Sequence, residues 1–276
     1  MKDGIPLAGV IGWPINHSRS PVLHGYWLER YGITGYYVPV AVAPENLREA
    51  LGSLSLLGFR GVNVTIPHKE AVLELAKTVS ETAKAIGAAN TITFLEGGGF
   101  HADNTDAYGF RENIRQTHPD WRADRGPALV IGAGGASRAV IQTLIDEGTP
   151  EIRLANRTRQ RAEALSEHFG GPVKPVDWSK LEDATDSAVT VVNTTALGMA
   201  GQEPLEVNLM RADPEAIVSD IVYVPLETPF LKKASSQGFR TVDGLGMLLH
   251  QGVPGFQAWF GKMPVVDADL RARVLG

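Results

Sequence analysis

The sequence predicts an α/β protein of two domains, and three observations support that fold class. The chain has 276 residues, which is enough for two domains of ordinary size. Short apolar runs alternate with helical segments along most of it. The run 128–131 breaks into Gly132, Gly134 and Gly135 before helix-forming residues begin. That order of strand, glycine turn and helix is typical of a Rossmann-type dinucleotide-binding domain.

Composition narrows the class of protein. Hydrophobic residues make up 43% and charged residues 21%, as in globular proteins, and the net charge is −5. No basic block is present, so we do not expect nucleic acid as a partner. Cysteine is absent, and no apolar run approaches the ~20 residues of a membrane helix. The N-terminus shows no cleavable signal pattern, and we expect a cytoplasmic protein without membrane contact.

The first hundred residues predict a βαβαβ arrangement. Strands are expected at 5–11, 36–42, 59–66 and 88–94, and helices at 21–31, 44–57 and 71–86. The glycines at 97–99 predict a hairpin-like turn into Phe100, and a further helix is expected from 107.

Polar residues gather where these elements begin and end. Ser18 and Ser20 come just before the first helix, where hydroxyls either cap the helix or bind a polyhydroxylated ligand; both interpretations stay open. Alternation along 59–66 predicts that Asn63 and Thr65 share one face of the strand.

Lys69 follows the same strand at a helix start, where a cation opposes the helix dipole. It is either a solvated surface lysine or part of a ligand site at the carboxyl end of the strand. Asp106 is either a helix N-cap or a carboxylate aimed at the same site as Lys69.

The second half predicts a doubly wound parallel sheet. After a connector at 118–126, strands are expected at 151–155, 173–176, 188–192, 216–222 and 239–242, with helices at 136–147, 158–169 and 228–236. From Gly244, two helical pieces are expected, interrupted by Gly252, Pro254 and Gly255. Gln251, in the first piece, is either a satisfied core amide or a hydrogen-bond partner of a ligand.

The end of the strand 151–155 predicts the cofactor. An NAD site expects an acidic residue there to hold the ribose hydroxyls. This chain instead has Asn156, Arg157, Thr158 and Arg159, with Arg161 close behind. Guanidinium groups and a hydroxyl suit a 2′-phosphate, so the sequence predicts NADP. The alternative is a set of surface arginines at a helix start.

Eight motifs in order resemble one family. They are G-W-P-I-N-H-S-R-S-P at 12–21, N-V-T-I-P-H-K at 63–69, G-A-A-N-T at 87–91, N-T-D at 104–106, G-A-G-G-A at 132–136, N-R-T-R-Q-R at 156–161, D-I-V-Y-V-P at 220–225 and G-M-L-L-H-Q at 246–251. The chain, from about residue 9 to 261, resembles the shikimate dehydrogenases, which interconvert 3-dehydroshikimate and shikimate with NADP. Two local departures from the family pattern are His24-Gly25 and the residues Ala102-Asp103 before N-T-D.

The resemblance implies a substrate-binding and catalytic domain at 1–106 with 247–276, and a Rossmann-type NADP-binding domain at 107–246. It implies that Lys69 and Asp106 are the catalytic pair. The implied substrate-binding residues are Ser18, Ser20, Thr65, Lys69, Asn90, Asp106, Tyr223 and Gln251. The implied cofactor-binding residues are Gly132, Ala133, Gly134, Gly135, Ala136, Asn156, Arg157, Thr158, Arg161, Ile221, Gly244 and Met247. No metal site is expected.

The same fold would also serve two other functions. One is a paralogue that oxidises quinate, with NAD or NADP; the other is a non-catalytic NADP-binding sensor, which would be expected to lack Lys69 or Asp106. The expected partner is a small-molecule substrate, shikimate or 3-dehydroshikimate. The sequence leaves the oligomeric state open, with a homodimer as one possibility.

Overall fold

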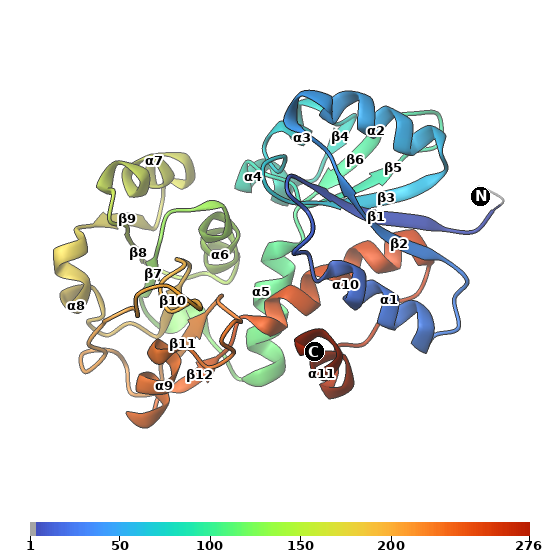
Figure 1. Cartoon of the computed structure of the whole chain (residues 1–276). Coiled ribbons are helices and arrows are strands. Elements are labelled where there is room, and N and C mark those ends of the chain that lie inside the picture. The colour runs from blue at the N-terminus through green and yellow to red at the C-terminus, as the bar shows by residue number, and fades with distance from the viewer. Residues whose placement is uncertain (1–3) are drawn as a thin grey trace. The chain divides into compact units, whose positions relative to one another are not determined.

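The computed structural model describes residues 4–276, which form two compact units (Figure 1). The first comprises the described residues up to Gly109 together with Leu249–Gly276, and the second comprises Phe110–Leu248. Helices α5 (Asp106–Thr117) and α10 (Leu245–Phe260) each contribute residues to both units. Within residues 4–276, no helix combines the length and the apolar character needed to cross a bilayer.

The first unit contains a mixed six-stranded sheet with the order β2-β1-β3-β5-β6-β4. Its strands are β1 (Leu7–Gly12), β2 (Tyr36–Ala41), β3 (Phe59–Val64), β4 (Thr78–Val79), β5 (Thr91–Phe94) and β6 (Phe100–Asp103). The predicted βαβαβ start is confirmed, because β1 pairs in parallel with both β2 and β3. Strand β5 is antiparallel to β3 and β6, and the glycines at 97–99 form the β5–β6 turn.

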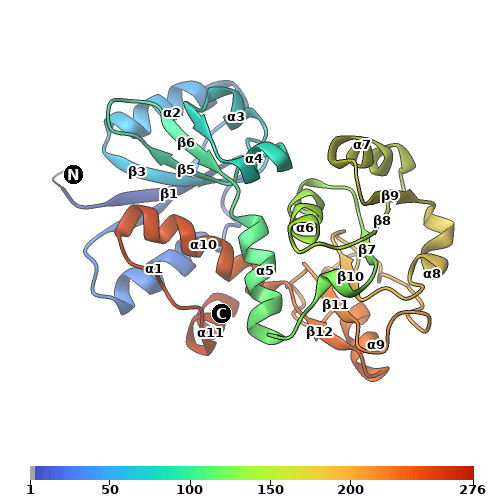
Figure 2. The same cartoon turned by 180° about the vertical axis from the view of Figure 1, so that it is seen from behind.

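Helices cover both faces of this sheet (Figures 1 and 2). They are α1 (Ser20–Arg30), α2 (Leu47–Leu56), α3 (Ala71–Leu75), α4 (Glu81–Ile86), the C-terminal part of α10, and α11 (Ala268–Leu275), with a 3₁₀ turn at Pro44–Asn46. Successive residues of β3 point to opposite faces of the sheet. Val62 and Val64 pack against the leucines of α2 on one face, while Gly61 packs against Trp259 of α10 on the other. The last helix, α11, was not predicted.

The single helix expected at 71–86 is wrong. The helix stops at Leu75, Ala76 is extended, and Thr78–Val79 pair in parallel with β6. Ser80 then starts α4, because its hydroxyl accepts a hydrogen bond from the Ala83 N–H at 3.0 Å. The pairing of 78–79 with a distant strand is a tertiary contact, which local helical spacing does not reveal.

The second unit is a six-stranded, wholly parallel sheet with the order β12-β11-β10-β7-β8-β9. Its strands are β7 (Ala128–Ile131), β8 (Ile152–Ala155), β9 (Val173–Val176), β10 (Thr190–Asn193), β11 (Ile217–Asp220) and β12 (Arg240–Val242). Its other helices are α6 (Gly135–Asp146), α7 (Arg159–Phe169), α8 (Leu181–Ala184) and α9 (Pro229–Ser236), with 3₁₀ turns at Ala123–Arg125 and Trp178–Lys180. The predicted doubly wound fold is confirmed.

Strand alternation also builds the two apolar layers of the second unit. Ala128 and Val130 belong to a cluster that includes residues of α5, α6 and α7. Leu129 and Ile131 belong to a second cluster, with residues of α8 and α9. Strand β7 is therefore buried on both sides, as expected for a parallel sheet between two helical layers.

The expectation of two helical pieces after Gly244 is wrong, because α10 runs without a break from Leu245 to Phe260 with Pro254 inside it. Two of its glycines serve close packing. A Cβ at Gly252 would lie 2.8 Å from Leu23 Cδ2, and a Cβ at Gly246 would lie 1.7 Å from Asn113 Oδ1. These positions exclude larger residues without ending the helix.

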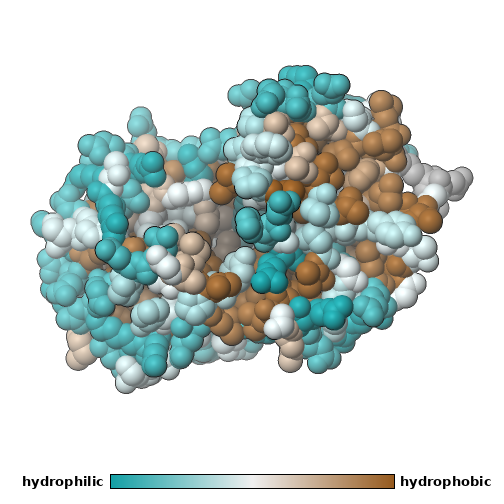
Figure 3. Space-filling model, in the orientation of Figure 1, coloured by the Kyte–Doolittle hydropathy of each residue, from teal (hydrophilic) through white to brown (hydrophobic). Residues whose placement is uncertain are grey.

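Apolar side chains are also exposed on the first unit. Figure 3 shows hydrophobic residues gathered on its surface in this view, whereas the second unit is mostly hydrophilic there. The exposed ones include Tyr36 and Val38 on the edge strand β2, and Leu56 and Leu57 at the end of α2.

The core of the first unit contains a buried histidine in an aromatic cluster. The ring of His24 stacks on Tyr37 with centroids 4.0 Å apart, and Trp27, Phe256 and Trp259 surround it. Among the residues described, neither ring nitrogen has a hydrogen-bond partner. Burial lowers the pKa of His24 to about 3, and the nearby Asn63 side chain opposes this shift only in part.

We expect this histidine to make the protein less stable in acid. The unfolded state binds the proton near pH 6.5, whereas folded His24 does so only near pH 3. Above pH 6.5, the histidine therefore does not lower the free energy of unfolding. As the pH drops from 6.5 toward 3, the free energy of unfolding falls by up to about 1.4 kcal/mol per pH unit. Urea unfolding of the wild type and His24→Phe between pH 4 and 8 measures the difference. Parallel pH profiles for the two proteins would contradict this account.

Candidate active site

A polar cluster in the first unit joins residues from four segments. Lys69 lies in the turn after β3, Asn90 comes just before β5, Asp106 opens α5, and Gln251 lies on α10. Lys69 Nζ lies 2.6 Å from Asp106 Oδ2, and Asn90 Nδ2 donates to Asp106 Oδ1 at 2.8 Å. Both carboxylate oxygens of Asp106 thus have a donor, and the expected pairing of Lys69 with Asp106 is present.

The exposure of this pair suits a ligand site. The side chain of Lys69 is 29% exposed and that of Asp106 is 15% exposed. The ion pair is therefore partly shielded from water, which strengthens it relative to a surface pair, yet it can still be reached. The alternative of a fully solvated Lys69 does not fit these values. The N-cap alternative for Asp106 does not fit either, because its oxygens accept from Lys69 and Asn90.

Hydrogen bonds fix which way the Asn90 amide points. Its Oδ1 accepts from the Thr105 N–H at 2.8 Å and from the Thr91 hydroxyl at 3.0 Å. Its Nδ2 must therefore point the other way, toward Asp106 and toward Gln251 Oε1 at 3.4 Å. The Thr105 hydroxyl also donates to the Gln251 carbonyl oxygen at 2.8 Å, which ties α10 to this cluster.

Sequence reasoning did not assign the two threonines to the site. Thr91 and Thr105 are both buried, and each follows an asparagine in the motifs A-A-N-T and N-T-D. The repeated Asn-Thr pair is the feature of the sequence that points to these threonines, because a threonine next to a functional asparagine can orient the asparagine side chain. Without the fold, nothing showed that the two pairs meet.

A buried layer lies beneath Asn90. Asn63 on β3 stands opposite Thr91 on β5 in the strand register, and it donates to the Thr91 hydroxyl at 3.0 Å and to the Asn90 carbonyl at 3.2 Å. It accepts from the Tyr37 hydroxyl at 2.7 Å. Burial raises the pKa of Tyr37 well above its usual range, so the phenol stays a neutral donor. The sequence predicts that Asn63 and Thr65 share a face of one strand. Strand β3 ends at Val64, so Thr65 lies one residue beyond it, although its N–H still bonds to the Ile11 carbonyl of β1.

The serines and Thr65 occupy turns beside other strand ends. Ser18 Oγ accepts from the Ser20 N–H at 3.3 Å at the start of α1, and Ser20 itself is buried. The N-cap residue of α1 is Arg19, and it makes no side-chain capping bond. Thr65 donates its N–H to the Ile11 carbonyl at 3.0 Å and accepts from the His68 N–H at 2.9 Å. It therefore shapes the turn that leads to Lys69.

The glycine turn of the second unit has the geometry of an anion site. Gly132 has φ +111°, and a Cβ there would lie 2.6 Å from Thr194 Oγ1, so only glycine fits. Gly134 is the N-cap of α6, and no atom lies within 4 Å of a Cβ built at Gly134 or Gly135. Backbone N–H groups at an open helix N-terminus favour a phosphate. Ser137, at the third fingerprint position, bonds back to the Gly134 carbonyl at 2.6 Å.

The basic segment after β8 is joined to this turn. Asn156 Oδ1 accepts from the Ala133 N–H at 3.0 Å, and its Nδ2 donates to the Thr158 carbonyl at 2.8 Å. The Arg157 guanidinium lies 5.6 Å from the Trp178 ring centroid and 3.7 Å from Glu203, and its side chain is 62% exposed. Arg159 instead pairs with Glu163 and Asp177. Arg161 is exposed.

The remaining predicted cofactor residues lie near the ends of β11 and β12. A Cβ at Gly244 would lie 2.1 Å from the Ile221 carbonyl oxygen, so the close approach of these two segments requires glycine. Ile221 and Met247 pack in the same apolar cluster. Tyr223 is partly exposed in the segment after β11. Across the described residues, no group of three or more metal-ligating side chains is present.

Buried Asp220 anchors that segment. It accepts hydrogen bonds from Asn193 Nδ2, the Val222 N–H and the Thr228 hydroxyl. Burial raises the pKa of its carboxyl, and these hydrogen bonds oppose the shift.

Three family models match the chain in the order of the fold. Residues 10–92 match the shikimate dehydrogenase substrate binding domain, and residues 115–221 match shikimate / quinate 5-dehydrogenase. Residues 244–272 match the shikimate 5'-dehydrogenase C-terminal domain.

Relatives and solved structures agree with these matches. Shikimate dehydrogenase (NADP(+)) of Paracoccus denitrificans is 58% identical, over 98% of this chain and 96% of the relative. A shikimate 5-dehydrogenase structure from Thermus thermophilus, in complex with NADP(H) and shikimate, is 37% identical with a TM-score of 0.85 and covers 99% of both chains. A quinate dehydrogenase from Corynebacterium glutamicum, in complex with NAD, is 32% identical with a TM-score of 0.89 and covers 98% of this chain and 99% of that chain.

These findings confirm the predicted enzyme class and the predicted NADP cofactor. With three family models matching most of its length and a relative 58% identical over nearly all of it, the chain belongs to the shikimate dehydrogenase family.

Proposed function

We propose that this protein catalyses the reversible, NADP-dependent reduction of 3-dehydroshikimate to shikimate. The observation that carries the proposal is the hydrogen-bonded set of Lys69, Asp106 and Asn90 at strand ends of the first unit. The relatives named as NADP(+)-dependent shikimate dehydrogenases support the substrate and the cofactor. Both members of the catalytic pair are present, which argues against a sensor that lacks them.

Lys69 is the residue suited to move the proton. When bound, NADPH supplies the hydride that adds to the ring ketone. The ammonium group of Lys69 would stabilise the negative charge that develops on the ketone oxygen and donate a proton to it. In the reverse direction, Lys69 would accept the proton from the alcohol. Asp106 would hold Nζ in place through the 2.6 Å contact, and Asn90 would hold Asp106.

The other polar residues would bind and orient the substrate. We assign the substrate carboxylate to Ser18 and Ser20, which lie on either side of an exposed Arg19. The ring hydroxyls would contact side chains that are already oriented by hydrogen bonds or turns, with Tyr223 as a further contact. These side chains are Thr65, Lys69, Asn90, Asp106 and Gln251. The first unit would then be the substrate-binding and catalytic domain.

The second unit would hold the cofactor. The open turn at 132–136 suits the pyrophosphate, because its N–H groups lie at the N-terminus of α6. Arg157, Thr158 and Arg161 would bind the 2′-phosphate, with Asn156 holding this segment to the turn. Ile221, Gly244 and Met247 would border the nicotinamide.

A cytoplasmic location and a homodimer stay predictions. The exposed Tyr36 and Val38 on the edge strand β2 support the homodimer, because large apolar side chains at an unpaired sheet edge favour association.

The function is tested by the absorbance of reduced nicotinamide with purified protein. Shikimate and quinate are each offered with NADP and with NAD. We expect rapid reduction with shikimate and NADP, and much slower reduction in the other three combinations. Comparable or faster rates with quinate or with NAD would assign the protein to the quinate-oxidising paralogue. No reduction in any combination, despite NADP binding, would support the sensor.

We also expect Arg157→Ala to weaken the use of NADP selectively. Loss of a charge-assisted contact to the 2′-phosphate should raise KM for NADP by about tenfold, since such bonds contribute about 1.5–3 kcal/mol. The KM for NAD, which lacks that phosphate, should not change. Arg211→Ala is the matched control, because this exposed arginine pairs with Asp183 and Asp186 elsewhere in the second unit. An equal rise in both KM values would contradict the assignment.

A further inference from the structure

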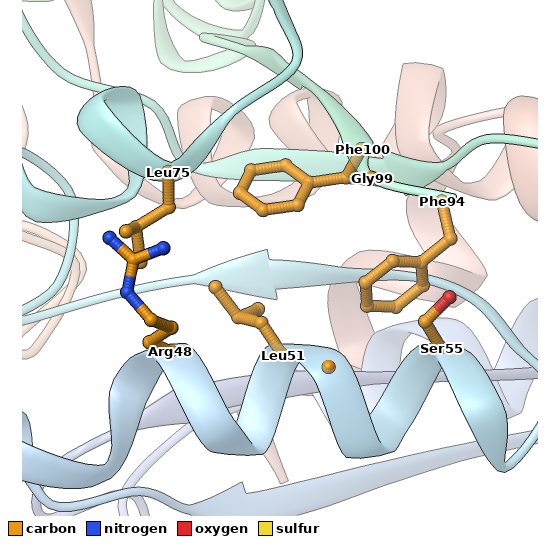
Figure 4. A pocket seen from close by; sticks show the side chains of 8 residues that line it. Arg48, Leu51, Ser55, Leu75, Phe94, Gly99 and Phe100 are labelled. Carbon is orange, nitrogen blue, oxygen red and sulfur yellow. The ribbon is translucent and has the colours of Figure 1, made fainter. Parts of the chain in front are cut away.

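A cavity lies in the first unit, on the face of the sheet that α2 covers (Figure 4). It has a volume of about 150 Å³ and is lined by one stripe of α2, by the end of α3, and by the β5–β6 hairpin. The lining residues are Arg48, Leu51, Gly52, Ser55, Leu75, Phe94, Gly99 and Phe100. None of them belongs to the Lys69 cluster, which is the hydrogen-bonded set of Lys69, Asn90, Asp106 and Gln251 with Asn63, Thr91 and Thr105. Thr91 contacts Asn63 in that cluster, and strand alternation puts Thr91 and Phe94 on opposite faces of β5.

The walls of this cavity suit an aromatic ring. Phe94 and Phe100, paired across the hairpin, stand at 84° with ring centroids 6.3 Å apart, so they offer both a ring face and a ring edge. Leu51 is buried and Leu75 is half-buried. A cavity of roughly 150 Å³ is known to hold a benzene ring when its lining is apolar. The space therefore fits a single six-membered aromatic ring.

One end of the cavity carries a positive charge. Figure 4 shows the Arg48 guanidinium at one end, with Phe94 and Ser55 at the other. Among the residues described, Arg48 has no ion-pair or hydrogen-bond partner, although Glu45 and Glu49 are close in sequence. It lies in the first turn of α2, where the helix dipole disfavours a cation and favours an anion. A ligand carboxylate at this end of the cavity would interact favourably with the Arg48 guanidinium and with the N-terminus of α2.

Gly52 keeps the floor of the cavity open. It lies in the middle of α2, where glycine is less favourable than alanine, and no atom lies within 4 Å of a Cβ built there. Packing therefore does not require glycine at this position. The spacing of Arg48, Leu51, Gly52 and Ser55 puts all four on the same face of α2, toward the cavity.

We propose that this cavity binds a small aromatic monocarboxylate, with the ring packed against the walls that Phe94 and Phe100 form and the carboxylate on Arg48. A phosphate or other hydrophilic anion would leave the apolar walls unused. A long aliphatic chain would exceed the volume. The site does not depend on the function proposed above, because it shares no residue with the Lys69 cluster.

Benzoate is the probe, and the amide chemical shifts of Gly52 and Gly99 in the full chain are the readout. Shikimate is present at saturating concentration, because benzoate is itself a carboxylate and could compete at Ser18 and Ser20. We expect saturable shifts with a Kd of about 1 mM, as is reasonable for so small a ligand. Benzyl alcohol, which lacks the charge, and cyclohexanecarboxylate, which lacks the aromatic ring, should each bind at least about tenfold more weakly.

Three variants test whether benzoate binds in this cavity and pairs with Arg48. Arg48→Gln should weaken benzoate binding at least about tenfold, whereas Arg273→Gln, at an exposed arginine on α11, should leave it unchanged. Gly52→Ala should raise Tm by about 1–3 °C while weakening binding, which an unfolding artefact could not produce. The proposal is overturned if Gly52 and Gly99 do not shift up to about 20 mM benzoate, or if Arg48→Gln binds as tightly as the wild type.

Discussion

The ion pair between Lys69 and Asp106 is the interaction on which the polar site of the first unit depends. Lys69 comes from a turn after a strand and Asp106 from the first residue of a helix, 37 residues apart in sequence. Both charges are partly removed from water, so each needs its partner to offset the loss of hydration. The pair therefore links the turn after β3 to the start of α5.

The buried amides and hydroxyls beneath this pair explain why it has a single arrangement. Asn90 can donate to Asp106 only because Thr105 and Thr91 already donate to its oxygen. Asn63 donates to the Thr91 hydroxyl in turn, and the Tyr37 hydroxyl donates to Asn63. Removing one member would leave a buried donor or acceptor unpaired, at a cost of about 1–3 kcal/mol. The Asn90 side chain is thus oriented by buried residues, of which Tyr37, Asn63 and Thr91 lie on strands of the sheet.

Sequence reasoning could identify candidate site residues because polar residues at strand ends are visible in the chain. Lys69 and Asp106 are candidates on this basis, and Asn90 follows from the family motifs. The glycine turn at 132–135 is predicted from its place between a strand and a helix, together with the segments on both sides of it. Other features were not accessible. The strand at Thr78–Val79 exists through pairing with β6. Helix α10 continues through Pro254, and its Gly246 and Gly252 pack closely against Asn113 and Leu23. The ion pairs that Arg159 forms with Glu163 and Asp177 likewise became visible only in the fold.

The most direct test of the account is a double-mutant cycle on the catalytic pair. Lys69→Ala, Asp106→Ala and the double variant are compared with the wild type by kcat/KM for shikimate and NADP. If the two residues act as one unit, each single change should cost about 10²-fold or more, and the double change little more than the worse single one. A double variant whose loss equals the product of the two single losses would show that they act independently, and would contradict the central claim.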